Sequence, residues 1–419
     1  MCPIELARET VMNTARANVV FGLLIFFLAS SAWADGAAIS NVTVRQRWPW
    51  DRKVDIDYQL LGESGQSFDV SVTARNGSQI LALPDVSLSG DRFDVRQGKR
   101  RIVWNPMVTG YTNETLTKFN VCLTPTNPPL YMIVDLTRAA GADGQIIYVY
   151  ESDLTGGAYG SVETNPVPGV ESLVWTGVTN NAAYMTTNLV LRRVASGSFQ
   201  MGGSTEVTLT KGLYAGVFEL TQAQWYNVMS NSISYSSVYP KADIAFGDVR
   251  GFSAGTNWPS SHGVDATSFI AKLRARTELS GFDLPTEAQG EYICRAGTTS
   301  YYYDGVTTSA DTSVLNGLAW WLGNSGNAAH PVGKKLPNAW GLYDTIGNLG
   351  EWCLDRYAGT TGLPGGTDPV GVTSGVSRAF RGYHYTGTAD GCGSGSRFYF
   401  SAPSTTSPKV GMRVVVFLP

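Results

Sequence analysis

The segment Pro337–Tyr357, PNAWGLYDTIGNLGEWCLDRY, decides the fold of the C-terminal half of this 419-residue chain. Its Gly347–Asn348 pair predicts a turn inside an otherwise apolar run. Asp344 and Glu351 flank that turn, so a chain that folds back there brings two carboxylates and the turn's carbonyls together. Hard oxygen ligands of this kind suit a calcium ion. The alternative is that both carboxylates only cap and solvate a loop.

The same segment resembles the GLYD block of the formylglycine-generating enzyme, or sulfatase-modifying-factor, family. Five further blocks match in the family's order, four of them before this segment and one after it, and they extend the resemblance over residues 189–419. They are Val194–Gly202 (VASGSFQMG), Val207–Met229 (VTLTKGLYAGVFELTQAQWYNVM), Leu284–Gly297 (LPTEAQGEYICRAG), Gly323–Gly333 (GNSGNAAHPVG) and Gly411–Val414 (GMRV). The resemblance implies an α+β domain with a C-type-lectin-like fold. The function is a separate question, because one fold hosts many functions.

The first residues predict export. The apolar run Val19–Ala29 is followed by the sequence AWA at 32–34, which predicts a signal peptide over residues 1–34, cleaved before Asp35. Met12 is an alternative start, and a retained membrane anchor is an alternative to cleavage. We therefore expect a secreted, periplasmic or cell-surface protein, attached to a membrane only if the signal segment stays uncleaved.

Short runs between residues 35 and 137 alternate polar and apolar residues, as in Val54–Leu60 and Lys118–Leu123. This period-2 pattern predicts a small antiparallel β-sandwich of immunoglobulin-like type. It contains no convergent acid, base or nucleophile. Residues 138–188 are predicted to be a linker with a β extension, ahead of the domain at 189–419.

Within that domain the pattern of apolar residues predicts an amphipathic helix at Asp265–Leu279. Thr286 is expected to cap a further helix, Glu287–Arg295. The runs Val207–Thr210 and Val217–Leu220 are predicted to be paired strands.

Charge and cysteine content narrow the function classes. A net charge of −3 gives no reason to expect a nucleic-acid partner. After cleavage the chain holds Cys122, Cys294, Cys353 and Cys392, which allow three pairings. Because Cys122 falls in the sandwich, we expect at most one disulfide in the C-terminal domain, with Cys353–Cys392 as the favoured pair.

Members of the resembled family that oxidise a sulfatase cysteine hold copper with two cysteines, five residues apart. The resemblance places Gly387 at the first of these positions and Cys392 at the second. Copper(I) prefers soft thiolate ligands, and one thiol does not supply the pair, so copper is not expected to bind. Cys392 would be catalytic only in an oxidase whose partner thiol comes from elsewhere, for which Cys353 is the nearby candidate. Gly290 and Gly350 replace the family's usual tryptophans, so the packing there must differ.

Calcium is implied by the resemblance. Its ligands would be the side chains of Asp344 and Glu351 and the backbone carbonyls of Gly347 and Leu349. The ion would hold a long loop that has little regular hydrogen bonding of its own. His330, in the family's His-Pro-Val-Gly block, is expected to be a packed turn residue and not a ligand.

The segment Tyr383–Phe400, YHYTGTADGCGSGSRFYF, combines aromatic residues with small hydroxyl residues and glycine, the composition of a paratope. It resembles the variable region of ligand-binding proteins that retroelements diversify and that share the C-type-lectin-like fold. The matching framework residues are Cys392, Ser394 and Arg397. An ordinary lectin-type loop is the alternative. The predicted contact residues are Tyr383, His384, Tyr385, Asp390, Phe398, Tyr399 and Phe400.

The sequence supports two candidate functions. The first is a non-catalytic, exported module that binds a protein or glycan ligand. The second is a formylglycine-generating oxidase acting on sulfatase cysteines, or a related oxygen-dependent enzyme, working through Cys392. The oxidase predicts two thiols at an open cleft, whereas the binding module predicts thiols that are buried or far apart.

Overall fold

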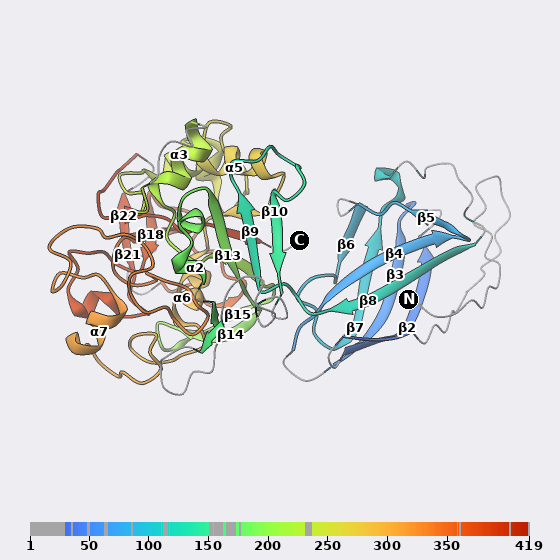
Figure 1. Ribbon diagram of the computed structural model, residues 1–419, viewed down its shortest axis with the longest axis horizontal. Helices are drawn as coiled ribbons and strands as arrows, with labels where there is room; N and C mark the ends of the chain where they lie inside the picture. Colours follow the sequence, from blue (N-terminus) through green and yellow to red (C-terminus); the bar gives the residue numbers. More distant parts are fainter. Residues whose placement is uncertain are drawn as a thin grey trace. The chain divides into compact units, whose positions relative to one another are not determined.

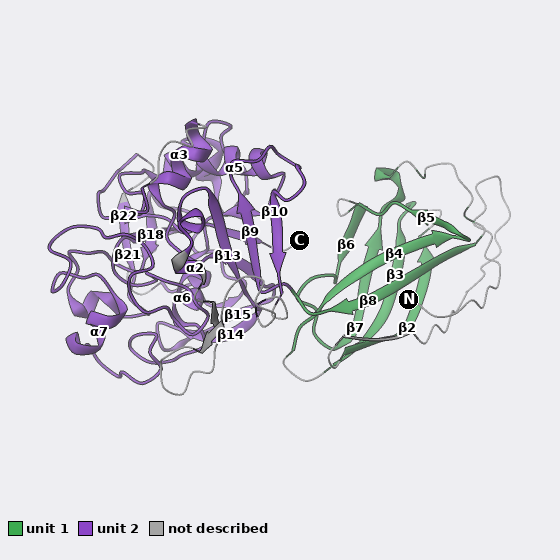
Figure 2. Cartoon of the chain, viewed as in Figure 1, with its two compact units in different colours: residues 1–128, 419 green, residues 129–418 purple. Residues whose placement is uncertain are grey.

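The computed structural model describes residues 30–417, except for 35–36, 48–50, 63–65, 85–86, 110, 112–115, 117, 151–153, 155–161, 165–172, 176, 231–236, 358, 360–361 and 402–403. The chain forms two compact units, which meet in sequence between Pro128 and Pro129 (Figure 2). Most of the predicted signal peptide lies outside the described residues, and its last part, Ser30–Ala34, forms strand β1. Within the described ranges, no helix is long and apolar enough to cross a membrane.

The first unit is the predicted antiparallel β-sandwich. Its sheets have the strand orders β1-β2-β3-β7-β6 and β5-β4-β8. Residues of both sheets, among them Ile56, Ile102, Val70 and Val121, share one apolar core. The strands are β1 (Ser30–Ala34), β2 (Ala37–Gln46), β3 (Val54–Leu61), β4 (Asp69–Asn76), β5 (Gln79–Leu81), β6 (Leu88–Gly90), β7 (Gly98–Trp104) and β8 (Phe119–Thr126), with a short 3-10 helix at Pro106–Val108.

The second unit is built on an antiparallel six-stranded sheet of order β10-β9-β13-β16-β23-β17 (Figure 1). The described part of this unit also contains short helices and three smaller sheets, of orders β21-β20-β18-β22, β14-β15-β19 and β11-β12, which makes it an α+β domain. The strands of the central sheet are β9 (Tyr131–Asp135), β10 (Ile146–Val149), β13 (Asn188–Val194), β16 (Leu213–Gly216), β17 (Phe282–Asp283) and β23 (Val415–Phe417). The remaining strands are β11 (Val162–Thr164), β12 (Leu173–Trp175), β14 (Gly197–Met201), β15 (Thr205–Leu209), β18 (Gly350–Arg356), β19 (Gly366–Thr367), β20 (Ser377–Arg381), β21 (Phe398–Ser401) and β22 (Val410–Gly411).

The structure corrects the predicted boundary between the units. Strand β9, which the sequence analysis placed in the sandwich range, pairs with β13, so that Val134 lies opposite Leu189. Strand β10, predicted to lie in the linker, completes the edge of the same sheet. Because side chains of β9 are buried in the second unit's core, Pro128 and not residue 137 ends the first unit.

The predicted pairing of Val207–Thr210 with Val217–Leu220 is wrong. The first run belongs to β15, which pairs with β14, with Phe199 opposite Val207. The strand that follows is β16, Leu213–Gly216, and it joins the central sheet between β13 and β23. Lys211–Gly212 separates two strands that enter different sheets, although local alternation made them look like one hairpin.

Helices α3 (Gln222–Ser230) and α5 (Phe269–Thr277) lie side by side, with the Trp225 and Phe269 rings stacked 4.8 Å apart (Figure 1). Helix α5 is shorter than predicted, because Ser268 caps it and the Asp265 carboxylate accepts instead from the amides of a preceding turn. Helix α6 spans Glu287–Arg295 with Thr286 as its cap, as predicted. The other helices are α2 (Gly177–Asn180), α4 (Phe246–Arg250) and α7 (Thr312–Leu318), with 3-10 turns at Ala182–Met185, Ala254–Asn257 and Ala389–Cys392.

Candidate functional site

Strand β21 divides the predicted contact residues between two faces. The rings of Phe398 and Phe400 stack on Phe380 of the neighbouring strand β20, at 5.5 and 5.2 Å. Tyr399 lies between them in sequence and therefore points to the opposite face, where it stacks on Tyr357 at 4.4 Å. It is 52% exposed. The alternation of a strand thus leaves Tyr399 as the surface residue of this trio and makes the two phenylalanines its support.

The turn after β20 positions the next group of predicted contacts. Tyr383 adopts a left-handed backbone conformation, with φ of 60°, and its ring stacks on Phe398 at 4.1 Å. His384 packs against that ring at 4.4 Å. Burial, with a smaller effect from Lys409, lowers the pKa of His384 to about 4, so its imidazole is neutral at pH 7. Asp390 is exposed on the 3-10 turn Ala389–Cys392.

Tyr385 does not belong to the surface. Its side chain is buried, its amide donates to the carbonyl of Asn348, and its carbonyl accepts from the Ser325 hydroxyl at 2.7 Å. The prediction that Tyr385 contacts a ligand directly is therefore corrected: it fixes the turn from inside.

Arg397, predicted as a framework residue, anchors the surface to the core. Its guanidinium donates twice to the Glu287 carboxylate, at 2.7 and 2.6 Å, and covers the ring of Tyr357 at 4.7 Å. Glu287 also accepts from Arg381, which donates in turn to Glu291 at 2.6 Å. The stack Arg397–Tyr357–Tyr399 is therefore tied to a buried ladder of ion pairs.

Cys392 is fully buried. It lies in an apolar cluster with Tyr302, Leu315 and Ile346. Burial, and to a lesser degree the nearby Cys294 thiol, raises the pKa of Cys392 to about 12. A thiol in this state is protonated and a poor nucleophile at pH 7.

Cys353 does not accompany Cys392. It lies on β18 beside Gly290 of helix α6, where an added Cβ would stand 3.5 Å from its sulfur. The predicted Cys353–Cys392 disulfide is wrong: within the described residues, Cys294, Cys353 and Cys392 are all free and buried. The thiol near Cys392 is Cys294, which no sequence motif marked, because it comes from α6 almost a hundred residues earlier.

Two glycines of this region lie directly against aromatic rings. A Cβ at Gly387, which the sequence resemblance matches to the family's first cysteine, would overlap the ring of Tyr383. A Cβ at Gly350 would overlap the ring of Phe380. Tyr383 and Phe380 therefore leave no room for a larger side chain at these two positions.

The predicted calcium ligands surround the turn at 344–351. Gly347 and Asn348 both have positive φ, of 74° and 57°, which forms the tight turn expected from the sequence. The Asp344 carboxylate accepts from the Gly333 amide with one oxygen, and its other oxygen is buried without a hydrogen-bond partner among the described residues. Burial raises the pKa of Asp344 to about 6. Glu351 is paired with Arg413, which donates to its two oxygens at 3.1 and 2.6 Å.

Glu219 is a member of this cluster that the sequence analysis missed. Its oxygens accept from the Leu349 amide at 2.8 Å and the Asn348 side chain at 2.6 Å. Burial, followed by the neighbouring Asp344 and Glu351, raises the pKa of Glu219 well above its usual value. The one local sign was a carboxylate inside the apolar run at 217–220.

The cluster of Glu219, Asp344 and Glu351 thus carries three carboxylates against the single guanidinium of Arg413. A divalent cation would neutralise the excess, and the unpartnered oxygen of Asp344 suits a hard ion. No group of three or more His, Cys, Asp or Glu side chains in the described ranges is placed to hold a metal, so backbone carbonyls would have to complete the shell. With backbone carbonyls completing the coordination shell, the residues of this cluster fit a calcium ion.

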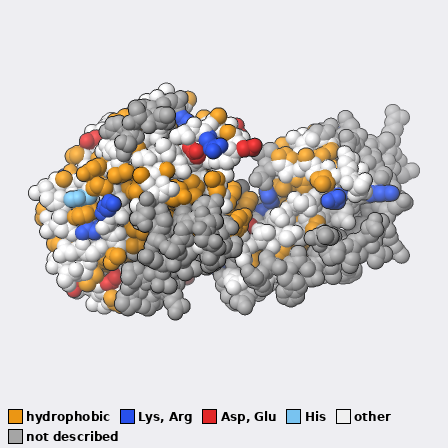
Figure 3. Space-filling model, viewed as in Figure 1, with side chains coloured by type: hydrophobic (Ala, Val, Ile, Leu, Met, Phe, Trp, Pro, Cys, Tyr) orange, Lys and Arg blue, Asp and Glu red, His pale blue; other side chains and the backbone are white. Residues whose placement is uncertain are grey.

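His330 is a packed turn residue, as predicted. Its ring stacks on Trp320 at 3.7 Å, and its Nε2 lies 2.8 Å from the carbonyl of Ser325. The Lys335 ammonium lies 3.8 Å from the centre of the Trp320 ring. Hydrophobic side chains lie across the middle of the second unit in the view of Figure 3, with a few charged side chains among them.

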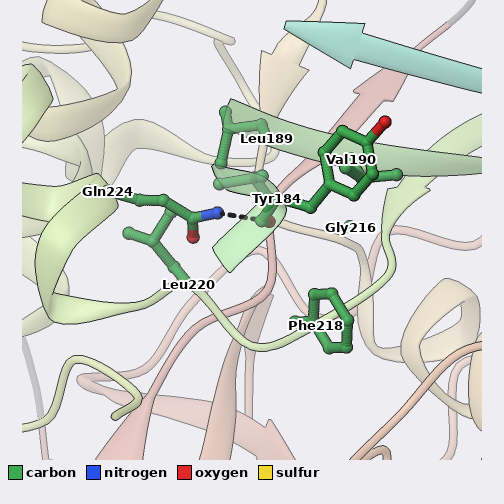
Figure 4. Close-up of a pocket in the computed structure, with 8 residues that line it drawn as sticks. Tyr184, Leu189, Val190, Gly216, Phe218, Leu220 and Gln224 are labelled. Atoms are coloured by element: carbon green, nitrogen blue, oxygen red, sulfur yellow. Dashed lines mark hydrogen bonds between the residues drawn. The ribbon is translucent and has the colours of Figure 1, made fainter. Parts of the chain in front are cut away.

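A small internal cavity lies apart from these residues (Figure 4). Its volume of about 10 Å³ is just enough for one water molecule. Gln224 lines it and donates to the Tyr184 carbonyl at 3.3 Å. The lining is otherwise apolar, from residues such as Leu189, Phe218 and Val414, so this cavity does not hold an organic substrate.

The family model described as the sulfatase-modifying factor enzyme 1-like domain matches residues 178–418. The chain belongs to this sulfatase-modifying-factor family. The formylglycine-generating enzyme of Streptomyces coelicolor is 32% identical over 148 residues, which cover 32% of this chain and 45% of that enzyme. The formylglycine-generating enzyme of Mus musculus is 28% identical over 150 residues, 31% and 40% of the two chains. The chain therefore matches less than half the length of these enzymes.

The chain is also similar to proteins that are not named formylglycine-generating enzymes. The chaperone protein LppX of Paenibacillus barcinonensis is 26% identical over 218 residues, 43% of this chain and 75% of LppX. Treponema denticola variable protein 1 shares 24% identity and a TM-score of 0.45, over 55% of this chain and 95% of that one. The U1 variant of the major tropism determinant shares 11% identity and a TM-score of 0.32, over 70% and 73% of the two chains. Likeness at this level concerns the fold and not the activity.

Proposed function

We propose that this chain is an exported, non-catalytic member of the sulfatase-modifying-factor family that binds a protein or glycan ligand through its C-terminal aromatic segment. One observation carries the proposal: the ring of Tyr383 occupies the space that a side chain at Gly387 would need. Cys392, left without its family partner, is enclosed in an apolar cluster. A buried, protonated thiol is poorly suited to oxidise a substrate cysteine.

Buried contacts hold the proposed binding surface around Tyr399 in place. Tyr399 presents an exposed ring whose inner neighbour, Tyr357, rests on the guanidinium of Arg397. Glu287 fixes that guanidinium with two short hydrogen bonds. Such preorganisation lowers the entropic cost of binding, and tyrosine supplies large contact area with few rotatable bonds. Tyr399, Asp390 and the half-buried Tyr383 and His384 are therefore the proposed contact residues, with Phe398 and Phe400 behind them.

Calcium has a structural role in the proposal. Asp344, Glu351 and the carbonyls of Gly347 and Leu349 would hold the ion, which would neutralise the buried acidic cluster and fix the turn at 344–351. That turn supports the binding segment, because the Asn348 carbonyl accepts from the amide of Tyr385 and the Gly347 amide donates to the carbonyl of Gly382.

A formylglycine-generating oxidase is the second candidate function. It is favoured by the 32% identity to the Streptomyces coelicolor enzyme and by Cys294, which brings a second sulfur near Cys392. Burial of both thiols opposes it.

The two functions are separated by one pair of assays on the purified chain. A peptide with the sulfatase-type sequence Cys-x-Pro-x-Arg is incubated with the protein, copper and oxygen, and formylglycine is measured by mass spectrometry. The same preparation is applied to a glycan array. We expect no peptide oxidation and selective glycan binding that Tyr399→Ala abolishes. Peptide oxidation that Cys392→Ala abolishes would overturn the binding proposal.

A further inference from the structure

Two cysteines from distant parts of the chain come together in the second unit. Cys294 is the penultimate residue of helix α6, and Cys392 ends the 3-10 turn Ala389–Cys392. Both are buried in one apolar cluster, whose other members include Tyr302, Ala319 and Ile346. Their thiols are close enough to interact electrostatically.

Polar groups converge on the first of these thiols. The hydroxyls of Thr345 and Ser394 lie beside the sulfur of Cys294. Their residues are only 4% and 3% exposed, and neither hydroxyl has a hydrogen-bond partner among the described residues. Buried hydroxyls without partners are uncommon in folded proteins. Burial raises the pKa of the Cys294 thiol, and these two hydroxyls, placed to donate to its sulfur, oppose that rise in part.

Cys353 provides the contrast. It is equally buried, but its neighbours are Gly290 and the side chain of Arg381, and it is not a member of the Cys294–Cys392 cluster. Burial alone therefore does not distinguish Cys294 and Cys392 from Cys353. What distinguishes them is that they share one cluster and that two hydroxyls without other partners lie beside Cys294.

We propose that Cys294 and Cys392 form a dithiol that closes into an intramolecular disulfide when a small disulfide supplies the oxidising power. Cys294 loses its proton and attacks one sulfur of the small disulfide, which forms a mixed disulfide and releases the first small thiol. Cys392 then loses its proton, attacks the Cys294 sulfur and releases the second small thiol. Two electrons and two protons pass to the small disulfide, and the new bond ties helix α6 to the segment that carries the proposed contact residues. The cross-link does not depend on the binding function proposed above.

Burial makes this reaction slow in the folded protein, since the thiolate is the reactive form. Oxidation is therefore tested under conditions that let the cluster open: the full chain is refolded from denaturant with oxidised glutathione as the probe. Remaining thiols are blocked with N-ethylmaleimide under denaturing conditions, and the digest is mapped by mass spectrometry. We expect a joined peptide pair containing Cys294 and Cys392, and blocked Cys353.

The bond closes a loop of about 100 residues, so the oxidised form is expected to melt roughly 10 °C above the reduced form. Cys392→Ala removes the joined peptide and the dithiothreitol-sensitive rise in the melting temperature of the second unit, whereas Cys353→Ala, the matched buried control, keeps both. The peptide map of the wild-type chain shows by itself whether Cys294 and Cys392 are joined, even if Cys392→Ala fails to fold. A map in which Cys294 and Cys392 are both blocked by N-ethylmaleimide, or in which either is joined to Cys353, overturns the proposal.

Discussion

The ring of Tyr383 lies where a side chain at Gly387 would begin. The two residues are only four apart, and the turn between them brings the ring back over the Gly387 backbone. This contact leaves no room for a cysteine at Gly387, the position that the sequence resemblance matches to the first of the family's two cysteines, and it also holds Tyr383 in its stack on Phe398.

Restoring a cysteine at this position should destabilise the fold. Gly387→Cys forces the Tyr383 ring out of place, and overpacking of this kind typically costs about 1–3 kcal/mol of unfolding free energy. Urea unfolding measures the loss. Gly317→Cys is the control, since an added Cβ there lies 3.7 Å from Leu336, an ordinary contact. Equal stability of Gly387→Cys and wild type would show that Tyr383 is not held over Gly387.

Glu287 should be the most sensitive position of the ion-pair ladder. Glu287→Gln keeps the shape of the side chain but leaves Arg381 and Arg397 without the carboxylate that both now contact. Breaking a buried ion pair from one side costs about 3–5 kcal/mol. Urea unfolding at pH 7 tests this, with Glu206→Gln as an exposed control on β15. A loss no greater than that of the control would mean that the ladder does not support the fold.

Tyr399 should matter for binding and little for stability. Because the ring is 52% exposed, Tyr399→Ala is expected to change the unfolding free energy by less than about 1 kcal/mol. Loss of an aromatic contact at the centre of an interface costs about 2 kcal/mol or more, roughly a thirtyfold loss of affinity. Titration with a glycan selected on the array measures it. Phe252→Ala, which removes a ring that is 54% exposed, should leave the affinity unchanged. Similar losses in both variants would contradict the assigned surface.

The sequence predicted well those features that depend on neighbours in the chain. Thr286 and the helix Glu287–Arg295 were predicted correctly because a capping box is local. Features made by distant segments were missed: Glu219 reaches Asn348 across the fold, and Cys294 meets Cys392 only once helix α6 has packed. The contact residues were predicted from the composition of their segment, which does not say which side chains reach the surface. In the structure, the alternation of strand β21 places Tyr399 on one face and Phe398 and Phe400 on the other. Strand β9 was assigned to the wrong unit because periodicity identifies a strand but not its sheet.

Asp355 should make the protein less stable as the pH rises. Burial, and next the charge of Glu287, raises the pKa of Asp355 from 3.8 to about 7. Between those values the folded state binds more protons than the unfolded state, so the unfolding free energy falls as the pH increases. The loss of unfolding free energy caused by Asp355 is absent below about pH 4 and complete above about pH 7, where it is on the order of 4 kcal/mol. Melting curves from pH 4 to pH 8 in the presence of a chelator should flatten in Asp355→Asn. An unchanged slope in that variant would assign the effect to other groups.

Removal of calcium should lower the melting temperature through Asp344. A ligand at a hundred times its dissociation constant stabilises the folded state by about 2.7 kcal/mol, which is several degrees for a unit of this size. Asp344→Asn removes the carboxylate that has one buried oxygen without a hydrogen-bond partner among the described residues, so the melting temperature of this variant should no longer respond to calcium or to chelation. Asp355→Asn changes a buried carboxylate outside the cluster and should keep the full response. Because the pKa of Asp344 is raised to about 6, the calcium effect should be large at pH 7.5 and should vanish near pH 4, where the carboxyl is protonated. A wild-type melting temperature that is the same with calcium and with chelator at pH 7.5 would mean that Arg413 alone balances the cluster.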